Sequence, residues 1–566
     1  MKQRRFGFFL AVFSILNLVI LGRLFYWQII KGGELAAVAK RQRLDVEETY
    51  APRGIIYSQD EYPLVTNNTS YRINVYLPNL DVSSQELVDK ISPIIADSDD
   101  EEVVEATASA MMDYFSTGRK WLTLNYEISQ NKKKIIEEMD LGGIDFEEKE
   151  IRDYPEASMA AQLVGFVGSD KRGNPQGYFG LEGNYHQQLS GQPGLLIGES
   201  NPFGQTILSG ERIEEEMQPG MNLTLHLERA IQFILEEELK KGIETHGAKS
   251  GWAVILDPNT GAVLGMASFP NYHPGDFSEY EDELYPNPIV AEGFEPGSVF
   301  KPLIMAAAIE EGKVKPETKC TICDGPAVIG DHTVKTWNEK YHPNSTMKEV
   351  IANSDNVGMV YVSQQLGKKN ILEYLDKFGF GQKTEIDLQE EAELSIRPSN
   401  QWYPIDLATV SFGQGVLVTP IQLTRAFAAL ANGGKLVTPQ VVDRIWSRTE
   451  TIHQFEPKIA GRPISQATAE KVTDMLIGAV ENGPVDWTKI DNLVVAGKTG
   501  TAQIPIAGHY DDEKTITSFI GFAPANRPKF IMLVSLREPQ SSPWGSETAA
   551  PVWFNIAEKL KYYWEI

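Results

Sequence analysis

Residues 296–301 read PGSVFK, in which a serine and a lysine stand three residues apart directly after a proline–glycine break. The break precedes an apolar run that predicts a helix over residues 299–309. Ser298 would then lie at the helix N-terminus, where backbone N–H groups stabilise a developing negative charge. Lys301 would lie one turn further along the same face, so its amine could take the proton of the serine hydroxyl. The stretch therefore predicts a serine nucleophile with a lysine base.

Two further motifs accompany this one in the same part of the chain. Residues 354–356 read SDN and residues 498–501 read KTGT. S-x-x-K, S-x-N and K-T-G in this order are typical of serine acyltransferases that use a lysine where other enzymes use a histidine. Taken alone, the first motif is typical of an exposed helix and the third of a strand that ends in a turn. Their occurrence together and in order favours a catalytic site.

The residues of the second motif suit proton transfer. Ser354 could pass a proton to the leaving amine. Asn356 could hold Lys301 in place and also contact an amide group of the substrate. We therefore expect Ser298, Lys301, Ser354 and Asn356 to form the catalytic group.

The residues of the third motif suit a substrate terminus. Lys498, Thr499 and Thr501 offer a positive charge and hydroxyl groups to a C-terminal carboxylate. Gly500 lets a substrate backbone approach the edge of the strand. The backbone N–H groups of Ser298 and Thr501 would form an oxyanion hole, in which each donor contributes roughly 3 kcal/mol. We therefore expect this motif to bind the substrate.

The N-terminus predicts a membrane anchor. Three basic residues among the first five precede an uncharged and mostly apolar run over residues 6–22, and the aromatic residues 25–27 follow. At about 1.5 Å per residue, residues 6–27 can cross a hydrocarbon core of roughly 30 Å. A cleaved signal peptide is the alternative, but the nearest A-x-A sequence, at residues 37–39, lies well beyond the apolar run. We expect an uncleaved anchor with a cytoplasmic tail, and everything after Trp27 outside the cytoplasm.

The composition excludes some classes of function. The 566 residues carry a formal net charge of −25, so the phosphates of a nucleic acid would be repelled. Cys320 and Cys323 form a C-x-x-C pair, which is typical of a redox motif or of half a zinc site. Because no second C-x-x-C or spaced histidine pair accompanies it, we favour a structural or incidental pair and expect no metal site.

The pattern of apolar residues divides the chain into three parts. Residues 1–27 form the tail and anchor, residues 28–220 a first domain and residues 221–566 a second. In the second domain we expect helices over residues 225–242 and 549–563. Strands are expected over residues 252–256, 262–267, 493–496, 517–522 and 530–536. Since these strands come from both ends of the domain, we expect an α/β fold with one antiparallel sheet flanked by helices.

With these motifs the chain resembles the class B penicillin-binding proteins, the monofunctional peptidoglycan D,D-transpeptidases. In the second domain the resemblance is carried by residues 294–302 (FEPGSVFKP), 412–415 (FGQG), 419–423 (TPIQL) and 497–503 (GKTGTAQ). In the first domain the motifs that resemble the pedestal of this family are residues 53–56 (RGII), 154–155 (YP), 165–168 (GFVG) and 180–182 (GLE). Residues 57–61 (YSQDE) depart from the family, which usually has a turn of the Asp-Arg-Asn-Gly type there.

The resemblance implies a β-lactamase-like transpeptidase domain on a β-rich α+β pedestal, anchored in the cytoplasmic membrane by one transmembrane helix. It implies that a stem peptide ending in D-Ala-D-Ala acylates Ser298, releases D-alanine and is transferred to an acceptor amine. β-Lactam antibiotics would acylate the same serine, and no metal or organic cofactor is implied. The expected partners are peptidoglycan stem peptides, the lipid bilayer, a membrane peptidoglycan glycosyltransferase and other division proteins. The amino-acid sequence of residues 294–296 and 412–415 favours the division type over the elongation type.

Three other functions compete with this interpretation. A bifunctional penicillin-binding protein would carry the Glu-Asp-x-x-Phe signature of a glycosyltransferase, which residues 28–220 lack. A β-lactamase or β-lactam sensor stays open, because some lactamases use a modified lysine in place of the Glu-x-x-Leu-Asn motif that is missing after Ser354. A non-catalytic scaffold is disfavoured because every motif residue is present.

Overall fold

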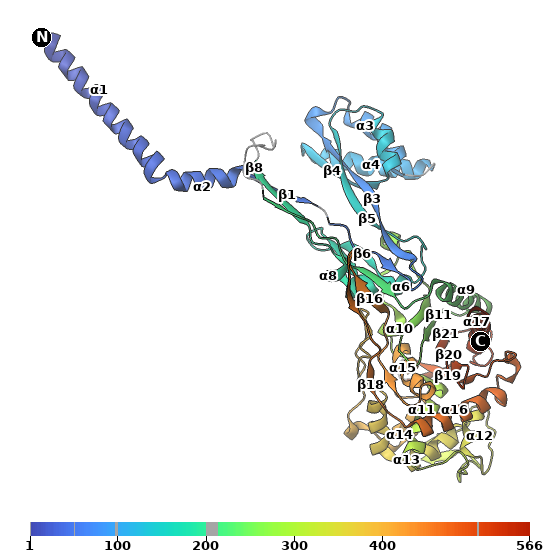
Figure 1. Ribbon diagram of the computed structural model, residues 1–566. Helices are drawn as coiled ribbons and strands as arrows, with labels where there is room; N and C mark the ends of the chain where they lie inside the picture. The colour runs from blue at the N-terminus through green and yellow to red at the C-terminus, as the bar shows by residue number, and fades with distance from the viewer. Residues whose placement is uncertain (1, 50, 97–99, 200–212, 507–508) are drawn as a thin grey trace. The chain divides into compact units, whose positions relative to one another are not determined.

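The computed structural model describes residues 2–49, 51–96, 100–199, 213–506 and 509–566 (Figure 1). The chain divides into two compact units, Met1–Arg53 with Ser190–Gly220, and Gly54–Leu189 with Met221–Ile566. The division into parts that end at residues 27, 220 and 566 stays a prediction.

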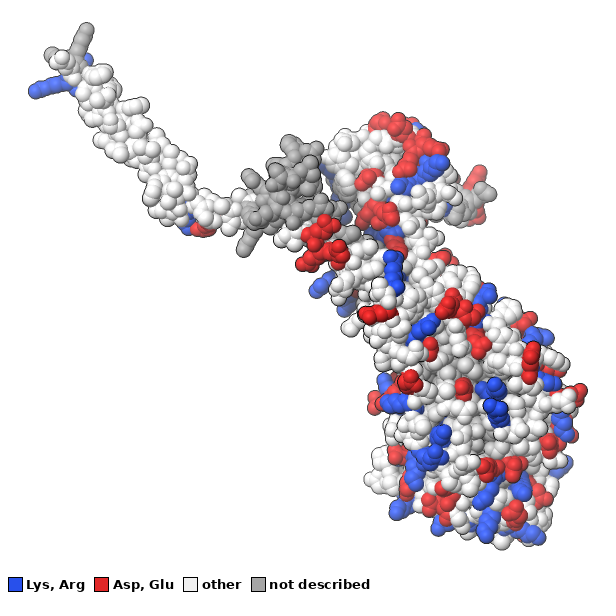
Figure 2. Space-filling model, in the orientation of Figure 1, with Lys and Arg blue, Asp and Glu red and all other residues white. Residues whose placement is uncertain are grey.

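The first unit contains the N-terminal helices and a small sheet. Its elements are α1 (Lys2–Phe25), η1 (Tyr26–Ile30), α2 (Gly32–Arg43), β1 (Leu44–Thr49), β8 (Gly194–Glu199) and β9 (Ile213–Glu215), and the strands pair in the order β1-β8-β9. Gln3–Ile30 is a helical stretch of 28 residues with a mean hydropathy of 2.2, long and apolar enough to cross a membrane. Residues 6–22 of α1 carry no charged side chain, and on the face that Figure 2 shows this part of the helix is uniformly white. The expected span over residues 6–27 lies inside this stretch and fits membrane anchoring.

Residues 54–189 are rich in β-structure, as expected for the pedestal. The elements are β2 (Ile56–Tyr57), β3 (Pro63–Tyr76), α3 (Ser84–Ala96), α4 (Glu101–Ser116), β4 (Trp121–Ile128), α5 (Gln130–Glu137), β5 (Ile144–Asp153), α6 (Ala161–Val164), β6 (Phe166–Ser169), β7 (Pro175–Tyr178), α7 (Gly180–Asn184) and α8 (His186–Leu189). β3 pairs antiparallel with β2, β4 and β5. β10 (Asn222–Leu225), β16 (Val442–Trp446) and β17 (Thr451–Gln454) extend this sheet in the order β17-β16-β10-β2-β3-β4. The sheet therefore crosses residue 220.

A further sheet lies entirely within residues 221–566 and has the expected topology. Its strands are β11 (Ser250–Leu256), β12 (Val263–Phe269), β19 (Ala496–Ile506), β20 (His509–Ala523) and β21 (Phe530–Arg537), in the order β12-β11-β21-β20-β19. Every neighbouring pair is antiparallel. The helices around it include α9 (Arg229–His246), α10 (Pro288–Ala291), α11 (Lys301–Glu310), α12 (Met347–Ala352), α13 (Asn356–Lys377), α14 (Pro404–Ser411), α15 (Pro420–Ala431), α16 (Gln466–Glu481) and α17 (Ala549–Trp564). The prediction of one antiparallel sheet built from both ends of the domain is confirmed.

Alternate residues of each strand face different layers of helices. In β11, Ala253 and Ile255 pack in one core with α9 and α17, whereas Val254 and Leu256 pack in another with α11 and α15 (Figure 1). From Lys301 to Ile309, every residue of α11 is buried. Since each fully buried large apolar side chain contributes roughly 1.5–3 kcal/mol, α11 is held firmly against the sheet.

Two expected boundaries are wrong. The helix expected from Leu225 begins at Arg229, because Leu225 is the last residue of β10, in which residues 223–225 are all buried. The strand expected over residues 493–496 begins only at Ala496, so the KTGT motif lies inside β19 and does not follow a strand. The partner strand β20 ends at Ala523, before Pro524, which has no N–H to donate to a strand pair.

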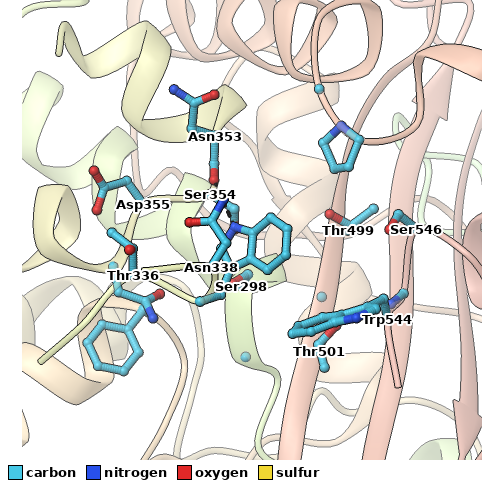
Figure 3. A pocket seen from close by; sticks show the side chains of 18 of the residues that line it. Ser298, Thr336, Asn338, Asn353, Ser354, Asp355, Thr499, Thr501, Trp544 and Ser546 are labelled. Carbon is cyan, nitrogen blue, oxygen red and sulfur yellow. Dashed lines mark hydrogen bonds between the residues drawn. The ribbon is translucent and has the colours of Figure 1, made fainter. Parts of the chain in front are cut away.

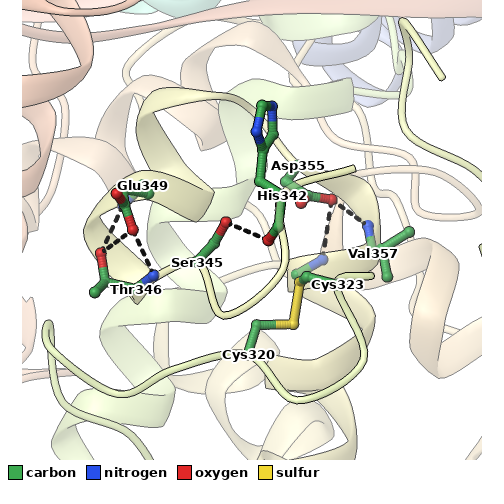
Figure 4. The surroundings of a disulfide bond; sticks show 9 residues. Cys320, Cys323, His342, Ser345, Thr346, Glu349, Asp355 and Val357 are labelled. Atoms are coloured by element: carbon green, nitrogen blue, oxygen red, sulfur yellow. Dashed lines mark hydrogen bonds between the residues drawn. A yellow bond between two sulfur atoms is a disulfide. The ribbon is translucent and has the colours of Figure 1, made fainter. Parts of the chain in front are cut away.

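Cys320 and Cys323 form a disulfide close to the second motif (Figure 4). The N–H of Cys320 donates to the carbonyl of Ser345 at 2.8 Å. Thr346 follows and caps α12, the helix that leads to Ser354. Of the alternatives that the C-x-x-C pair left open, the structural pair matches this disulfide, which closes a short loop within the segment between α11 and α12.

Candidate active site

Ser298 lies in a short 3₁₀ turn, η5 (Gly297–Phe300), that runs directly into α11. The expected helix N-terminus is thus present as a 3₁₀ turn. In this geometry, residues three apart lie nearly above one another, so Lys301 follows Ser298 on the same side. The backbone N–H of Lys301 donates to the carbonyl of Ser298, which closes the turn.

Close glycine contacts hold this turn against β19. Gly297 has a φ of +61°, and a Cβ built on it would lie 2.8 Å from the carbonyl oxygen of Thr501. A Cβ on Gly500 would lie 2.8 Å from the Val299 side chain. On the other side, the N–H of Gly297 donates to the carbonyl of Gly413 at 2.9 Å. The turn that carries Ser298 is therefore fixed between β19 and the segment after α14.

Gly413→Ala is expected to destabilise the protein by about 2 kcal/mol or more and to slow acylation, because the new methyl group displaces the turn of Ser298. Gly413 has a φ of +82°, and its Cβ would lie 2.1 Å from the carbonyl oxygen of Gly297. The matched control is Gly312→Ala, at a φ of +64° with no atom within 4 Å of the Cβ. The control should lose only about 1 kcal/mol and keep its acylation rate. If denaturant melts showed the same loss of free energy of unfolding in both variants, this account would be contradicted.

Lys301 is fully buried and its amine bonds to the second motif. Nζ lies 2.7 Å from the carbonyl oxygen of Ser354, 3.2 Å from its hydroxyl and 2.7 Å from Oδ1 of Asn356. A neutral amine would donate to the two shorter contacts and accept a hydrogen bond from the Ser354 hydroxyl. The structure therefore brings Lys301, Ser354 and Asn356 together directly behind the turn of Ser298.

The electrostatic surroundings favour a neutral Lys301. Burial lowers the pKa of Lys301 well below the usual value for lysine, and the positive charge of Lys498 lowers it further. Asp355 acts in the opposite direction. Its carboxylate is already engaged by the N–H groups of Val357 and Gly358, at 2.8 and 3.1 Å. An amine in this environment can accept a proton at neutral pH.

The turn that carries Ser354 is strained and well anchored. Ser354 has a φ of +55°, in the left-handed region that non-glycine residues seldom adopt. Asp355 caps α13, and the side-chain amide of Asn356 donates to the carbonyl of Lys335 at 3.2 Å. These contacts hold the Ser354 hydroxyl toward Lys301.

β19 supplies the other wall of the site as the edge strand of its sheet. Lys498 and Gly500 lie on the face of β19 that meets the turn of Ser298. Burial lowers the pKa of Lys498 to about 7. Its amine donates to the carbonyl of Thr499 at 3.1 Å and to the Thr499 hydroxyl at 3.3 Å. The charge of Lys498 can thus act on a ligand through Thr499.

One cavity of about 720 Å³ joins these parts. Six of the eight predicted site residues line it, namely Ser298, Ser354, Asn356, Thr499, Gly500 and Thr501. The two lysines lie buried behind them. Figure 3 shows Ser298 between the wall that carries Ser354 and Asp355 and the strand that carries Thr499 and Thr501. The arrangement can activate a hydroxyl, stabilise an oxyanion and hold a peptide along a strand edge.

The sequence did not reveal several lining residues. Thr336, Trp337 and Trp544 line the cavity but belong to no motif. The Thr336 hydroxyl is buried and has no hydrogen-bond partner within the described part of the chain. Gly413, which supports the turn of Ser298, lies in a segment that only the family resemblance marked. No local pattern distinguishes such residues, because they reach the site through long-range packing.

Comparison with known protein families gives two matches that together cover most of the chain. Residues 251–558 match the penicillin binding protein transpeptidase domain, and residues 48–225 match the penicillin-binding protein dimerisation domain. All three motifs, at residues 298–301, 354–356 and 498–501, lie inside the first match.

Individual relatives extend over the whole length. Stage V sporulation protein D of Bacillus subtilis is 31% identical over 561 residues, which cover 98% of this chain and 85% of that protein. Peptidoglycan D,D-transpeptidase FtsI of Escherichia coli is 28% identical over 548 residues, which cover 94% of this chain and 87% of that protein.

Solved structures share the fold. Penicillin binding protein 3 of Mycobacterium tuberculosis, complexed with aztreonam, superposes with a TM-score of 0.70 at 26% identity, over 92% of this chain and 98% of that one. Penicillin Binding Protein 2X of Streptococcus thermophilus has a TM-score of 0.74 at 23% identity, over 92% of this chain and 80% of that one.

Proposed function

Because the chain belongs to the class B penicillin-binding proteins, the family of peptidoglycan transpeptidases to which it is similar along its whole length, we propose that it is a serine-type D,D-transpeptidase with Ser298 as its nucleophile. The observation that supports this most strongly is the contact of the buried Lys301 amine with Ser354 and Asn356, directly behind the turn of Ser298. A buried amine beside a second lysine is a proton acceptor, and the turn presents a hydroxyl to the cavity.

In the first half-reaction, the stem peptide lies along the edge of β19 with its terminal carboxylate toward Lys498 and Thr499. Lys301 takes the proton of Ser298, whose oxygen attacks the carbonyl between the two D-alanines. The N–H groups of Ser298 and Thr501 stabilise the oxyanion. The C–N bond then breaks, and the leaving D-alanine amine receives the proton from Lys301 through Ser354. An acyl-enzyme on Ser298 and free D-alanine result.

In the second half-reaction, an acceptor amine from a neighbouring stem peptide replaces D-alanine. The amine gives its proton back through Ser354 to Lys301 and attacks the acyl carbonyl. Ser298 leaves, recovers its proton from Lys301, and a new amide bond cross-links the two peptides. β-Lactams would enter the same cavity and acylate Ser298 in the same way, which agrees with the aztreonam complex of the Mycobacterium tuberculosis relative.

The cellular setting that we propose is septal cell-wall synthesis at the cytoplasmic membrane. The helix Gln3–Ile30 would span the membrane once and leave the catalytic domain outside. The disulfide between Cys320 and Cys323 is typical of an oxidising compartment. The sequence of residues 294–296 and 412–415 favours the division type, so the partners that we propose are a membrane peptidoglycan glycosyltransferase and other division proteins. A fluorescent fusion that labelled the lateral wall and not the division site would contradict the septal assignment.

The test of the proposed function is the position and lifetime of a penicillin adduct. Mass spectrometry after labelling with a fluorescent penicillin is expected to find the adduct on Ser298. The adduct should persist for about an hour or longer. A transpeptidase activates an acceptor amine and not water, so hydrolysis of the penicillin ester on Ser298 should be slow. Release of hydrolysed penicillin within minutes would indicate a β-lactamase instead. An adduct on any other residue would refute the nucleophile assignment.

A further inference from the structure

One end of the cavity around Ser298 is not explained by the three motifs. Four residues of the loop 482–487 line this end together with Asn353, which directly precedes Ser354. Figure 3 shows Asn353 on the far side of Ser354 from Thr501. This end therefore lies away from the part of β19 along which the donor peptide continues.

Two contacts fix the loop 482–487 in place. A Cβ on Gly483 would lie 3.3 Å from the carbonyl oxygen of Ala352, the last residue of α12. Val485 is buried in the same core as Leu493, which lies three residues before β19 begins. The loop thus bridges the end of α12 and the start of β19, so its exposed side chains keep a defined position in the cavity.

The side chains at this end suit an aliphatic amine. Trp487 exposes 62% of its surface, and Pro484 is also exposed. The side-chain amide of Asn353 is exposed and has no hydrogen-bond partner within the described part of the chain. An indole ring packs against methylene groups and attracts an ammonium ion, while a free amide can donate to and accept from a peptide group. The combination fits a methylene chain that ends in an amine and is attached to a peptide.

The position of this end matches the second half-reaction. In the first half-reaction the D-alanine amine leaves beside Ser354, with the carboxylate of D-alanine toward Thr499. The acceptor amine enters by the same path, because the second half-reaction is the reverse of the first with a different amine. The atoms attached to the acceptor amine then lie beyond the place of D-alanine, where Asn353 and the loop 482–487 line the cavity. The donor continues past Thr501 in the opposite direction, so the two substrates do not compete for space.

We propose that Asn353 and the exposed residues of the loop 482–487 form the acceptor site, and that this site takes a primary amine at the end of an unbranched methylene chain on a peptide. The proposal rests on the proposed function and names the class of its second substrate. Trp487 and Pro484 hold the methylene chain, and Asn353 binds a peptide group of the acceptor.

The amine reaches the acyl carbon in its neutral form. Its nitrogen forms the new C–N bond while the ester C–O bond to Ser298 breaks. One proton of the amine passes through Ser354 and Lys301 to the oxygen of Ser298, so the enzyme returns to its starting state.

The test measures how the acyl-enzyme divides between amine and water in the full-length protein in detergent. A donor peptide that ends in D-Ala-D-lactate forms the acyl-enzyme. The two acceptors are Nα-acetyl-lysinamide, whose amine ends a methylene chain, and ethylamine, which has a similar basicity but no chain that reaches the loop. The ratio of amide product to hydrolysed product is independent of the acylation rate, because both products arise from the same acyl-enzyme. In the unchanged protein this ratio is expected to be about tenfold higher with Nα-acetyl-lysinamide than with ethylamine.

Trp487→Ala should reduce this preference to about twofold or less, and Trp487→Phe should retain part of it. Asn353→Ala should lower the ratio about threefold with Nα-acetyl-lysinamide and leave it unchanged with ethylamine, which carries no peptide group. The matched control is Trp544→Ala. Trp544 lines the same cavity with 37% of its surface exposed, but Gly545 directly after it donates to the Thr501 hydroxyl at 3.2 Å, which places it at the donor's end. This control should keep the full preference.

A preference that survived in both Trp487→Ala and Asn353→Ala would overturn the proposal, and so would an equal loss in Trp544→Ala. Failure of the proposed function would look different. In that case the donor would leave Ser298 of the unchanged protein without an acyl group, and neither product would form.

Discussion

Ser298→Ala is expected to lower the rate of covalent labelling by penicillin by a factor of about 10⁴ or more while the fold stays intact. The variant removes the only atom that we assign to bond formation and leaves the surrounding turn unchanged. Since Ser298 is half-buried, the free energy of unfolding should change by about 0.5 kcal/mol or less. Labelling followed by intact-mass spectrometry and a denaturant melt measure the two effects.

The control for this prediction is Ser354→Ala. The Ser354 hydroxyl lies 3.2 Å from Nζ of Lys301 and is the other hydroxyl close to the base. If Ser354 only relays protons, its alanine variant should still be labelled on Ser298, at a rate about 10²-fold lower. Labelling of Ser354 in the Ser298→Ala protein would show that the two roles had been assigned the wrong way round.

Lys301→Met is expected to slow acylation about 10³-fold and to remove the acidic limb of its pH profile. Only the neutral amine can accept a proton. The rate in the unchanged protein should therefore rise with pH through the pKa of Lys301, and below that pKa it should fall about tenfold for each pH unit. Because burial and Lys498 hold the pKa of Lys301 well below that of an ordinary lysine, the rise should be complete far below pH 10.5.

For ligands that carry a carboxylate, Lys498 should make the acylation rate fall again at higher pH. Its pKa of about 7 means that its positive charge is lost as the pH rises further, so the affinity for the carboxylate declines. The second-order rate of acylation by penicillin should then pass through a maximum. A profile of Lys301→Met that kept the acidic limb of the unchanged protein would show that another group is the base.

Which side chains line the cavity was predictable in part, because most of the predicted site residues belong to short motifs. A serine and a lysine three residues apart, or a lysine–threonine–glycine run, define their own relative geometry once the backbone conformation is known. The contact of the Lys301 amine with Ser354 and Asn356 joins two motifs that lie more than 50 residues apart, and only the occurrence of the motifs together predicted it. The antiparallel sheet was predictable for a related reason, since its buried strands are short apolar runs bounded by turns.

The parts that could not be predicted depend on long-range packing. The contact between Trp337 and Trp544 and the support of Gly297 by Gly413 join residues far apart in the chain. The periodicity of apolar residues along the sequence does not indicate which distant residues will be in contact. Similarly, the start of β19 depends on where its partner β20 ends, and that end is set by a proline nearly thirty residues later.

The order β12-β11-β21-β20-β19 also constrains how the protein is made. Leu256 in β11 pairs with Ile531 in β21, so the interior of the sheet stays unpaired until nearly the whole polypeptide has been synthesised. Contacts between such distant residues form slowly, because a long loop must close first. A chain that terminated before residue 530 would lack the central strand β21, which pairs with β11 and β20, so the sheet behind α11 and the turn of Ser298 could not assemble. Completion of translation and the appearance of activity are thereby coupled in this fold.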